Sequence, residues 1–249
     1  EKGYPALKPA APKAGDLPLL IDTRWGKHYA CAFKKAPGER VDRTDMSQEI
    51  MFSYGKALGN LHVLSRAYQP KARMWSCFDA LDWARAQLDA VGAPQSVRDA
   101  LGQAREELAA LPKSAEDFGL VHNDFEPDNV FYDAGTGVCS AIDFEDGMYH
   151  FYALDVAKAL DAVEEEAPAG RFEEARDALL EGYRAQAPLG REAEELFPLM
   201  RRFQSAYAYA RIAYCLAERP AEEPDWMREL CAKLEARLAA LEAGMCGDD

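Results

Sequence analysis

Apolar and polar residues follow two different periods along this chain, one typical of helices and one typical of strands. The helical period is clearest where Ile50, Tyr54 and Leu58 lie four positions apart, and it predicts a long helix. Asp45, with Gln48 three positions later, resembles a capping box. We therefore expect this helix to begin near residue 45.

Further helical segments make the carboxyl half of the chain mostly helical. One block covers residues 77–111, is interrupted near Gly92 and Pro94, and ends before Pro112. The glutamates at 164–166 predict a surface loop rather than a low-complexity segment. The later segments with helical spacing cover residues 155–163, 172–186, 192–217 and 225–241.

Strand-like runs occur in two places, and the first lies near the amino terminus. Residues 17–22 and 28–33 are short apolar runs, and the sequence between them is typical of a turn. We expect an antiparallel hairpin that closes near Gly26.

The second strand-like place also predicts a hairpin. Residues 129–132 and 138–142 favour strands, and five residues with two glycines join them in a tight turn. Residues that face one another then have numbers that sum to about 271 or 272. Asn129 is therefore expected beside Ile142 or Asp143.

Acidic residues concentrate around this second hairpin. His122 and Asp124 precede its first strand, and Glu145 and Asp146 follow its second strand. The open end of the hairpin thus collects oxygen ligands of the hard type that Mg²⁺ prefers. An acidic, solvated surface hairpin would show the same pattern, and spacing alone does not separate the two interpretations.

Overall charge narrows the class of partners. The 249 residues include 29 basic and 43 acidic side chains, for a net charge of −14. This charge repels phosphate backbones and anionic lipid, so we expect a small-molecule substrate, no nucleic acid and no membrane. Six scattered cysteines without a CxxC pair, and no bilayer-length apolar run, predict a cytoplasmic protein. An oligomer is not inferred.

The acidic hairpin carries a resemblance to a known family. His122-x-Asp124-x-x-x-x-Asn129, followed by Ile142-Asp143-Phe144, resembles the catalytic and metal-binding loops of protein-kinase-like phosphotransferases, in the aminoglycoside phosphotransferase and choline kinase branch. Residues 32–39 resemble the family's interlobe hinge, and residues 58–65 resemble its first carboxyl-lobe helix. Residues 153–160 resemble the Asp-bearing start of the helix after the metal loop. The resemblance covers residues 17–215. It implies an α+β, protein-kinase-like fold, mostly the helical carboxyl-terminal lobe with a catalytic β-hairpin.

The resemblance also implies roles for individual residues. Asp124 would accept or orient the proton of the substrate hydroxyl, and Asn129 and Asp143 would bind Mg²⁺ against the phosphates. His122 would brace the catalytic loop. Asp155 would be a structural tie at a helix start. The adenine of ATP, or the base of GTP, would lie against the backbone of Phe33, Lys34 and Lys35, and the remaining support or substrate candidates are Glu126, Glu145, Asp146 and Tyr149.

Two departures from the family pattern limit what the resemblance implies. Glu126 stands where kinases of protein substrates often have Lys, which argues against protein hydroxyls as acceptors. Residues 1–16 contain no Gly-rich phosphate loop, strand Lys or partner Glu. We therefore expect the amino-terminal lobe to be largely missing from the chain, with residues 1–38 as its remnant hairpin and hinge. Residues 39–249 would form the helical carboxyl-terminal lobe.

Together these features predict a kinase that transfers the γ-phosphate of ATP or GTP to a hydroxyl of a small, cationic molecule. An aminoglycoside or an amino alcohol would fit. One alternative is a pseudokinase, a regulatory nucleotide-binding module without turnover. A second alternative is a metal-dependent hydrolase built on the same carboxylates, which would need a metal site without nucleotide.

Other polar and aromatic residues have structural interpretations. His62 is expected to be a hydrogen-bonded core histidine, and Phe203, Tyr207 and Tyr214 are expected in the core. The tryptophans at 75 and 83 could form the floor of a pocket for a cation, although packing is the default expectation.

Overall fold

The computed structural model describes residues 3–13, 17–24, 26–219 and 223–245. The chain forms two compact units, and each consists of several chain segments. Unit 1 contains Glu1–Leu64, Asp124–Asp146 and Ala159–Pro188. Unit 2 contains Ser65–Asn123, Gly147–Lys158 and Leu189–Asp249.

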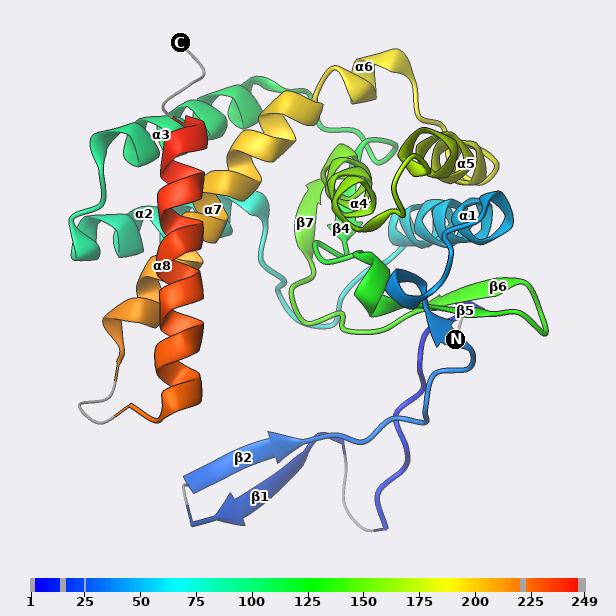
Figure 1. Cartoon of the computed structure of the whole chain (residues 1–249), viewed down its shortest axis with the longest axis horizontal. Helices are drawn as coiled ribbons and strands as arrows, with labels where there is room; N and C mark the ends of the chain where they lie inside the picture. The colour runs from blue at the N-terminus through cyan, green and yellow to red at the C-terminus, as the bar shows by residue number, and fades with distance from the viewer. Residues whose placement is uncertain (1–2, 14–16, 25, 220–222, 246–249) are drawn as a thin grey trace. The chain divides into compact units, whose positions relative to one another are not determined.

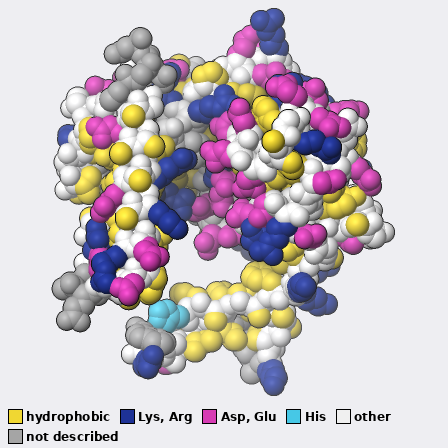
Figure 2. Space-filling model, viewed as in Figure 1, with side chains coloured by type: hydrophobic (Ala, Val, Ile, Leu, Met, Phe, Trp, Pro, Cys, Tyr) yellow, Lys and Arg dark blue, Asp and Glu magenta, His cyan; other side chains and the backbone are white. Residues whose placement is uncertain are grey.

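Unit 1 contains the predicted amino-terminal hairpin. Strands β1 (Leu19–Thr23) and β2 (Gly26–Ala30) pair antiparallel, with Thr23 opposite Gly26 (Figure 1). The hairpin and its turn position are confirmed. Among the described residues the two strands form a sheet of their own, and Figure 2 shows hydrophobic side chains along it.

The second sheet of unit 1 contains the predicted acidic hairpin. Strands β5 (Val130–Asp133) and β6 (Val138–Ala141) pair antiparallel, and Val130 lies opposite Ala141. These numbers sum to 271, which confirms the predicted register. The short strand β3 (Glu39–Arg40) extends the sheet on the β5 side. Two 3-10 helices accompany this sheet, η1 (Val41–Arg43) and η2 (Pro127–Asn129).

Helix α1 (Gln48–Ser65) is the long predicted helix, but its predicted start is wrong. Asp45 does not form a capping box with Gln48; its carboxylate accepts a hydrogen bond from the backbone N–H of Ser47. Met46 between them has a positive φ of 46°, so the chain is not helical directly before Gln48. The capping pattern requires a cap three positions before N3, whereas Gln48 is already the first helical residue.

Helix α1 lies directly against α5 (Phe172–Arg184) within unit 1. A side chain at Gly55 would overlap the carbonyl oxygen of Leu179, and one at Gly182 would overlap the carbonyl oxygen of Phe52. The two glycines therefore let the two helix backbones touch, an approach that any larger residue would prevent.

Unit 2 is mainly helical. Gly92, with a φ of 63°, ends α2 and confirms the predicted interruption of the 77–111 block. The elements of unit 2 are α2 (Cys77–Val91), α3 (Gln95–Ala110), β4 (Phe118–Val121), β7 (Met148–Phe151), α6 (Arg191–Glu194), α7 (Phe197–Ala217) and α8 (Asp225–Met245). Helix α4 (Ala153–Glu166) begins in unit 2 and continues into unit 1.

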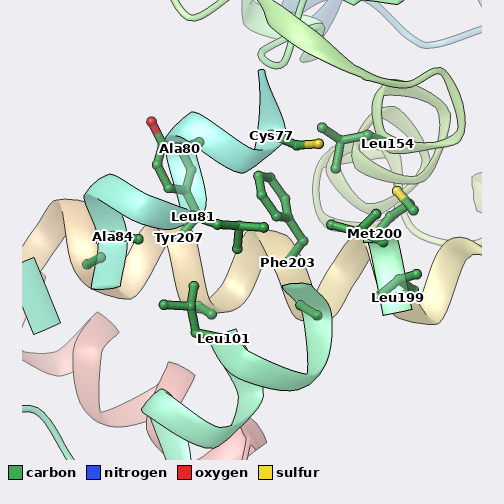
Figure 3. Close-up of a cluster of buried hydrophobic side chains, with 14 of the residues drawn as sticks. Cys77, Ala80, Leu81, Ala84, Leu101, Leu154, Leu199, Met200, Phe203 and Tyr207 are labelled. Carbon is green, nitrogen blue, oxygen red and sulfur yellow. The ribbon is translucent and has the colours of Figure 1, made fainter. Parts of the chain in front are cut away.

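The core of unit 2 forms around α7. Figure 3 shows Leu81, Leu101 and Phe203 converging from α2, α3 and α7. Leu154, near the start of α4, belongs to the same cluster and is fully buried. This cluster therefore fixes the beginning of α4, which carries Asp155.

Three further sequence predictions need correction. The pair β4–β7 was not expected, because each strand has four residues and includes Gly119 or His150 instead of a clean alternation. The glutamates at 164–166 end α4 and do not form a loop, since glutamate favours helices. The predicted 192–217 segment divides into α6 and α7, because Pro198 lies in the first turn of α7.

The predicted α+β class is confirmed, with helices in both units. The assignment of residues 1–38 to an amino-terminal lobe, and the expectation that most of this lobe is missing, stay predictions. None of the helices in the described ranges is long and apolar enough to cross a membrane.

The α1–α5 contact yields a stability test. Gly55→Ala and Gly182→Ala should each lower the free energy of unfolding by about 2 kcal/mol, because overpacking outweighs the roughly 1 kcal/mol gain in helix propensity. The matched control is Gly102→Ala in α3, where nothing lies within 4 Å of the added Cβ; it should stabilise by about 0.5–1 kcal/mol. Urea-unfolding midpoints measure all three. Equal effects of the three substitutions would contradict this packing.

Candidate active site

The catalytic-loop motif begins directly after β4, where a buried carboxylate binds the backbone. The N–H groups of His122 and Asn123 donate to the two carboxylate oxygens of Asp155, each at 2.7 Å. All three residues are buried. Hydrogen bonds to a charged acceptor are worth about 1.5–3 kcal/mol each, so Asp155 fixes the backbone that enters the loop.

The next part of the motif joins Asp124 to Asn129 within unit 1. Asn129 Nδ2 donates to the Asp124 carboxylate at 2.8 Å and to the Asp124 carbonyl oxygen at 3.1 Å. Between them Phe125 is buried, and the hydroxyl of Tyr54 on α1 donates to its carbonyl oxygen. The Asp124 side chain is therefore oriented by a loop that is itself attached to α1.

The hairpin brings Asp143 to the same end of the sheet as Asn129. The backbone N–H of Ile142 donates to the carbonyl oxygen of Asn129 at 3.0 Å. This bond confirms the predicted adjacency of the two segments. Asp143 follows at once, is exposed, and has a φ of 60°. A non-glycine residue in this left-handed region is uncommon and occurs often at functional sites.

The donor set at this end of the hairpin fits Mg²⁺. Because Asn129 uses its Nδ2 on Asp124, its amide oxygen remains the atom suited to a cation. Asp143 adds a carboxylate. Among the described residues, no group of three or more His, Cys, Asp and Glu is arranged to bind a metal. One amide and one carboxylate suit an ion that completes its shell with water and substrate phosphates.

A second group of carboxylates surrounds this loop in unit 1. Partial desolvation raises the pKa of the exposed Glu166 carboxyl, and the carboxylates of Asp42, Asp128 and Glu126 raise it further. The positive charge of Arg40, which binds Asp42 through two hydrogen bonds, lowers this pKa in part. Figure 2 shows acidic side chains gathered over unit 1. The excess of carboxylates over basic groups among these residues favours cations.

The residues predicted to contact the nucleotide follow strand β2 along the chain. Phe33, Lys34 and Lys35 are exposed. The backbone of Phe33 forms an antiparallel bridge to Pro9. Their predicted role in binding the nucleotide base stays a prediction.

The remaining candidates lie after β6. Glu145 is exposed and Asp146 is half-buried, both in unit 1. Tyr149 lies in β7 of unit 2, where its N–H donates to the carbonyl oxygen of Trp75 at 2.8 Å. The Tyr149 ring packs against Phe118, which accounts for its half-buried position.

Most of the structural interpretations are confirmed. His62 is fully buried, and its Nδ1 lies 2.8 Å from the Tyr183 hydroxyl. Trp83 makes edge-on ring contacts with Tyr207 and Tyr214. Phe203 and Tyr207 are buried, as predicted, whereas Tyr214 is 38% exposed, so the predicted core position is wrong for Tyr214. Trp75 is exposed.

Sequence reasoning missed three residues around the loop entry. Asn123 contacts Lys158 of α4 and Gln204 of α7 through hydrogen bonds. The two partners lie 35 and 81 positions away. No spacing rule identifies such partners, and the polar residue at 123 inside the motif was the available signal.

The chain is similar to known phosphotransferases in sequence. The sequence model of the phosphotransferase enzyme family matches residues 5–196. Amicoumacin kinase of Bacillus subtilis (strain 168) is 27% identical over 162 residues, which cover 62% of this chain and 46% of that protein. Homoserine kinase of Caulobacter sp. (strain K31) is 28% identical over 206 residues, 81% of this chain and 62% of that protein. The chain thus spans about half to three fifths of the length of these relatives.

Solved structures share the fold. Amicoumacin kinase hAmiN, in complex with AMP-PNP, Ca²⁺ and Ami, matches with a TM-score of 0.77 at 22% identity, over 98% of this chain and 72% of that chain. A microcompartment-associated aminopropanol kinase matches with a TM-score of 0.68 at 20% identity, over 97% and 74% of the two chains. Together with the family match over residues 5–196, these results establish that the chain belongs to the phosphotransferase enzyme family.

Proposed function

We propose that the protein is a kinase that transfers the γ-phosphate of ATP, or GTP, to a hydroxyl of a small cationic molecule. One observation carries the proposal. Asp124 is hydrogen-bonded to Asn129 at the end of the hairpin where Asp143 follows the Ile142–Asn129 backbone bond. The loop before β5 thus supplies the proposed acid–base group, Asp124, and the proposed metal ligand Asn129. The segment after β6 supplies the second proposed ligand, Asp143.

Asp124 is proposed as the catalytic residue. Its carboxylate is oriented by the Asn129 amide at 2.8 Å, and an oriented carboxylate can accept the proton of an acceptor hydroxyl. Phosphoryl transfer needs little covalent work from the protein, so positioning of the hydroxyl dominates. His122 is proposed to brace the loop, because its backbone is bound to Asp155 and its side chain is buried.

The Asn129 amide oxygen and the Asp143 carboxylate are proposed as the protein ligands of Mg²⁺. When bound, the ion would neutralise charge on the phosphates. Asp146 and Glu145, next along the chain, are proposed to support these ligands. We assign residues 1–38 to an amino-terminal lobe and residues 39–249 to the carboxyl-terminal lobe. The nucleotide base is proposed to lie against the 33–35 backbone.

The acceptor is proposed to carry positive charge. Support comes from the net charge of −14 and from the mutual repulsion of Glu166, Asp42, Asp128 and Glu126 beside the loop. A protonated amine near these carboxylates would relieve that repulsion. Two of the relatives are kinases of amicoumacin and aminopropanol. The proposed use of ATP and the scattered cysteines without a CxxC pair favour a cytoplasmic location for the protein.

Phosphotransfer is tested with Mg²⁺, γ-labelled ATP or GTP, and a panel of hydroxyl compounds with and without an amine. Label transfer to an amine-bearing acceptor is the expected result. Nucleotide binding without transfer to any acceptor would favour a regulatory module, and metal-dependent hydrolysis without nucleotide would favour a hydrolase. Transfer only to neutral acceptors would refute the proposed substrate charge.

Asp124→Asn tests the proposed base. The substitution should lower kcat by about 10²–10⁴-fold, because the amide cannot accept the hydroxyl proton. Affinity for nucleotide should change little, since Asp124 is proposed to contact the acceptor. The matched control is Asp99→Asn on the exposed face of α3, which should leave both values unchanged. Steady-state kinetics and calorimetric titration with nucleotide measure the two effects, and normal turnover by Asp124→Asn would contradict the assignment.

Asp143→Ala tests the proposed metal ligand. Nucleotide affinity in the presence of Mg²⁺ should fall at least tenfold, because one of two protein ligands is lost. Affinity without Mg²⁺ should be nearly the same as in the wild-type protein. Titrations with and without Mg²⁺ measure this difference. Equal loss under both conditions would show that Asp143 acts on the fold instead of on the ion.

A further inference from the structure

Three side chains from two helices bind one residue, Asn123, in unit 2. Asp155 accepts its backbone N–H at 2.7 Å, and Lys158 Nζ donates to its carbonyl oxygen at 2.7 Å. Gln204 Nε2 donates to its side-chain oxygen at 2.9 Å. Asn123 is 2% exposed. We call this arrangement the Asn123 clamp.

The backbone conformation of Asn123 explains why it needs several partners. Its φ of 62° lies in the left-handed region, which L-residues other than glycine adopt at a cost and asparagine tolerates best. Burial of the Asn123 amide also requires a hydrogen-bond partner. Gln204 supplies that partner, so its bond favours the native conformation over an extended one.

One hydrogen bond of the Asn123 clamp is made to the peptide group that joins Asn123 to Asp124. The carbonyl that accepts from Lys158 is half of the peptide unit between Asn123 and Asp124. A peptide unit is planar, so its orientation determines where the backbone nitrogen of Asp124 lies. Asp155 and Lys158 are three positions apart on α4 and therefore lie on one side of that helix.

We propose that Gln204 and Lys158 are positioning residues for Asp124 and act through Asn123. The proposal rests on the proposed function of Asp124. Gln204 comes from α7, whose neighbouring Phe203 is fully buried in the core cluster, so its position is fixed by packing. Catalytic groups must be placed within about 0.5 Å of their productive geometry, and a hydrogen bond from a rigid helix supplies that constraint.

Two substitutions of Gln204 separate hydrogen bonding from packing. Gln204→Ala should lower kcat about tenfold, the factor that corresponds to one typical hydrogen bond, while the KM for nucleotide stays within about twofold. Gln204→Met has nearly the same length and volume, but its thioether has no hydrogen to donate to Asn123, so kcat should fall similarly. Gln103→Ala, at an exposed position of α3, is the control. Wild-type kcat in Gln204→Met would overturn the proposal.

A double-substitution cycle tests whether Gln204 acts through Asn123. Asn123→Gly keeps the left-handed backbone accessible but lacks the side-chain oxygen. Adding Gln204→Ala to Asn123→Gly should therefore lower kcat no further. A further tenfold loss in that background would show that Gln204 acts elsewhere and would overturn the proposal.

Hydrogen exchange provides a measurement that does not depend on turnover. Gln204→Ala and Lys158→Met should speed exchange of the His122 and Asn123 amides about tenfold, because the loop opens more readily. Amides of α3 should be unaffected. If the wild-type protein transfers no phosphate, the proposed function fails, and the exchange rates still decide whether the clamp exists. Unchanged exchange in both variants would overturn it.

Discussion

The antiparallel pairing of β5 with β6 sets Val130 against Ala141, and the next bond outward joins the Ile142 N–H to the Asn129 carbonyl. All proposed metal ligands depend on this register. Side chains in a strand alternate between faces, so a shift by one residue would move Asp143 away from Asn129. The turn at residues 133–137 opposes such a shift, because Asp133 binds the N–H of Gly135 and the hydroxyl of Thr136.

Hydrogen bonds of the backbone and of side chains connect this register to the catalytic loop. Asn129 uses its carbonyl on Ile142 and its amide on Asp124, so one residue links the hairpin with the proposed base. On the preceding side, Asp155 binds the backbone of His122 and Asn123. The loop is thus fixed at its start by Asp155, which takes no part in the proposed chemistry, and at its end by Asn129, whose amide oxygen is a proposed metal ligand. The carboxylate of Asp143 is exposed and accessible to a ligand.

Local patterns in the sequence were sufficient for the parts of the fold that local forces decide. The hairpin register follows from two short strand-like runs and a glycine turn, and Gly92 marks the end of α2 as predicted. The spacing of the motif from His122 to Asn129 is likewise sufficient to locate the loop. These features depend on residues close together in the chain.

Long-range contacts, and one residue with a left-handed backbone, explain what the sequence did not reveal. Strands β4 and β7 are far apart in the chain, yet Val121 lies opposite Met148, and neither sequence shows a clear alternation of polar and apolar residues. The start of α1 was misplaced because the left-handed Met46 interrupts the chain before Gln48. Gln204 lies 81 positions from Asn123, and helical periodicity describes its helix but not its partner.

The position of a bound divalent cation is the decisive measurement for the proposed metal ligands. A crystal of the protein grown with Mn²⁺ and a non-hydrolysable ATP analogue would locate the ion by its anomalous scattering. We expect an ion bonded to the Asn129 amide oxygen and to an Asp143 carboxylate oxygen, at about 2.0–2.3 Å, the range of metal–oxygen bonds for such ions. An ion bound elsewhere, or bonded to neither residue while nucleotide is present, would contradict this expectation.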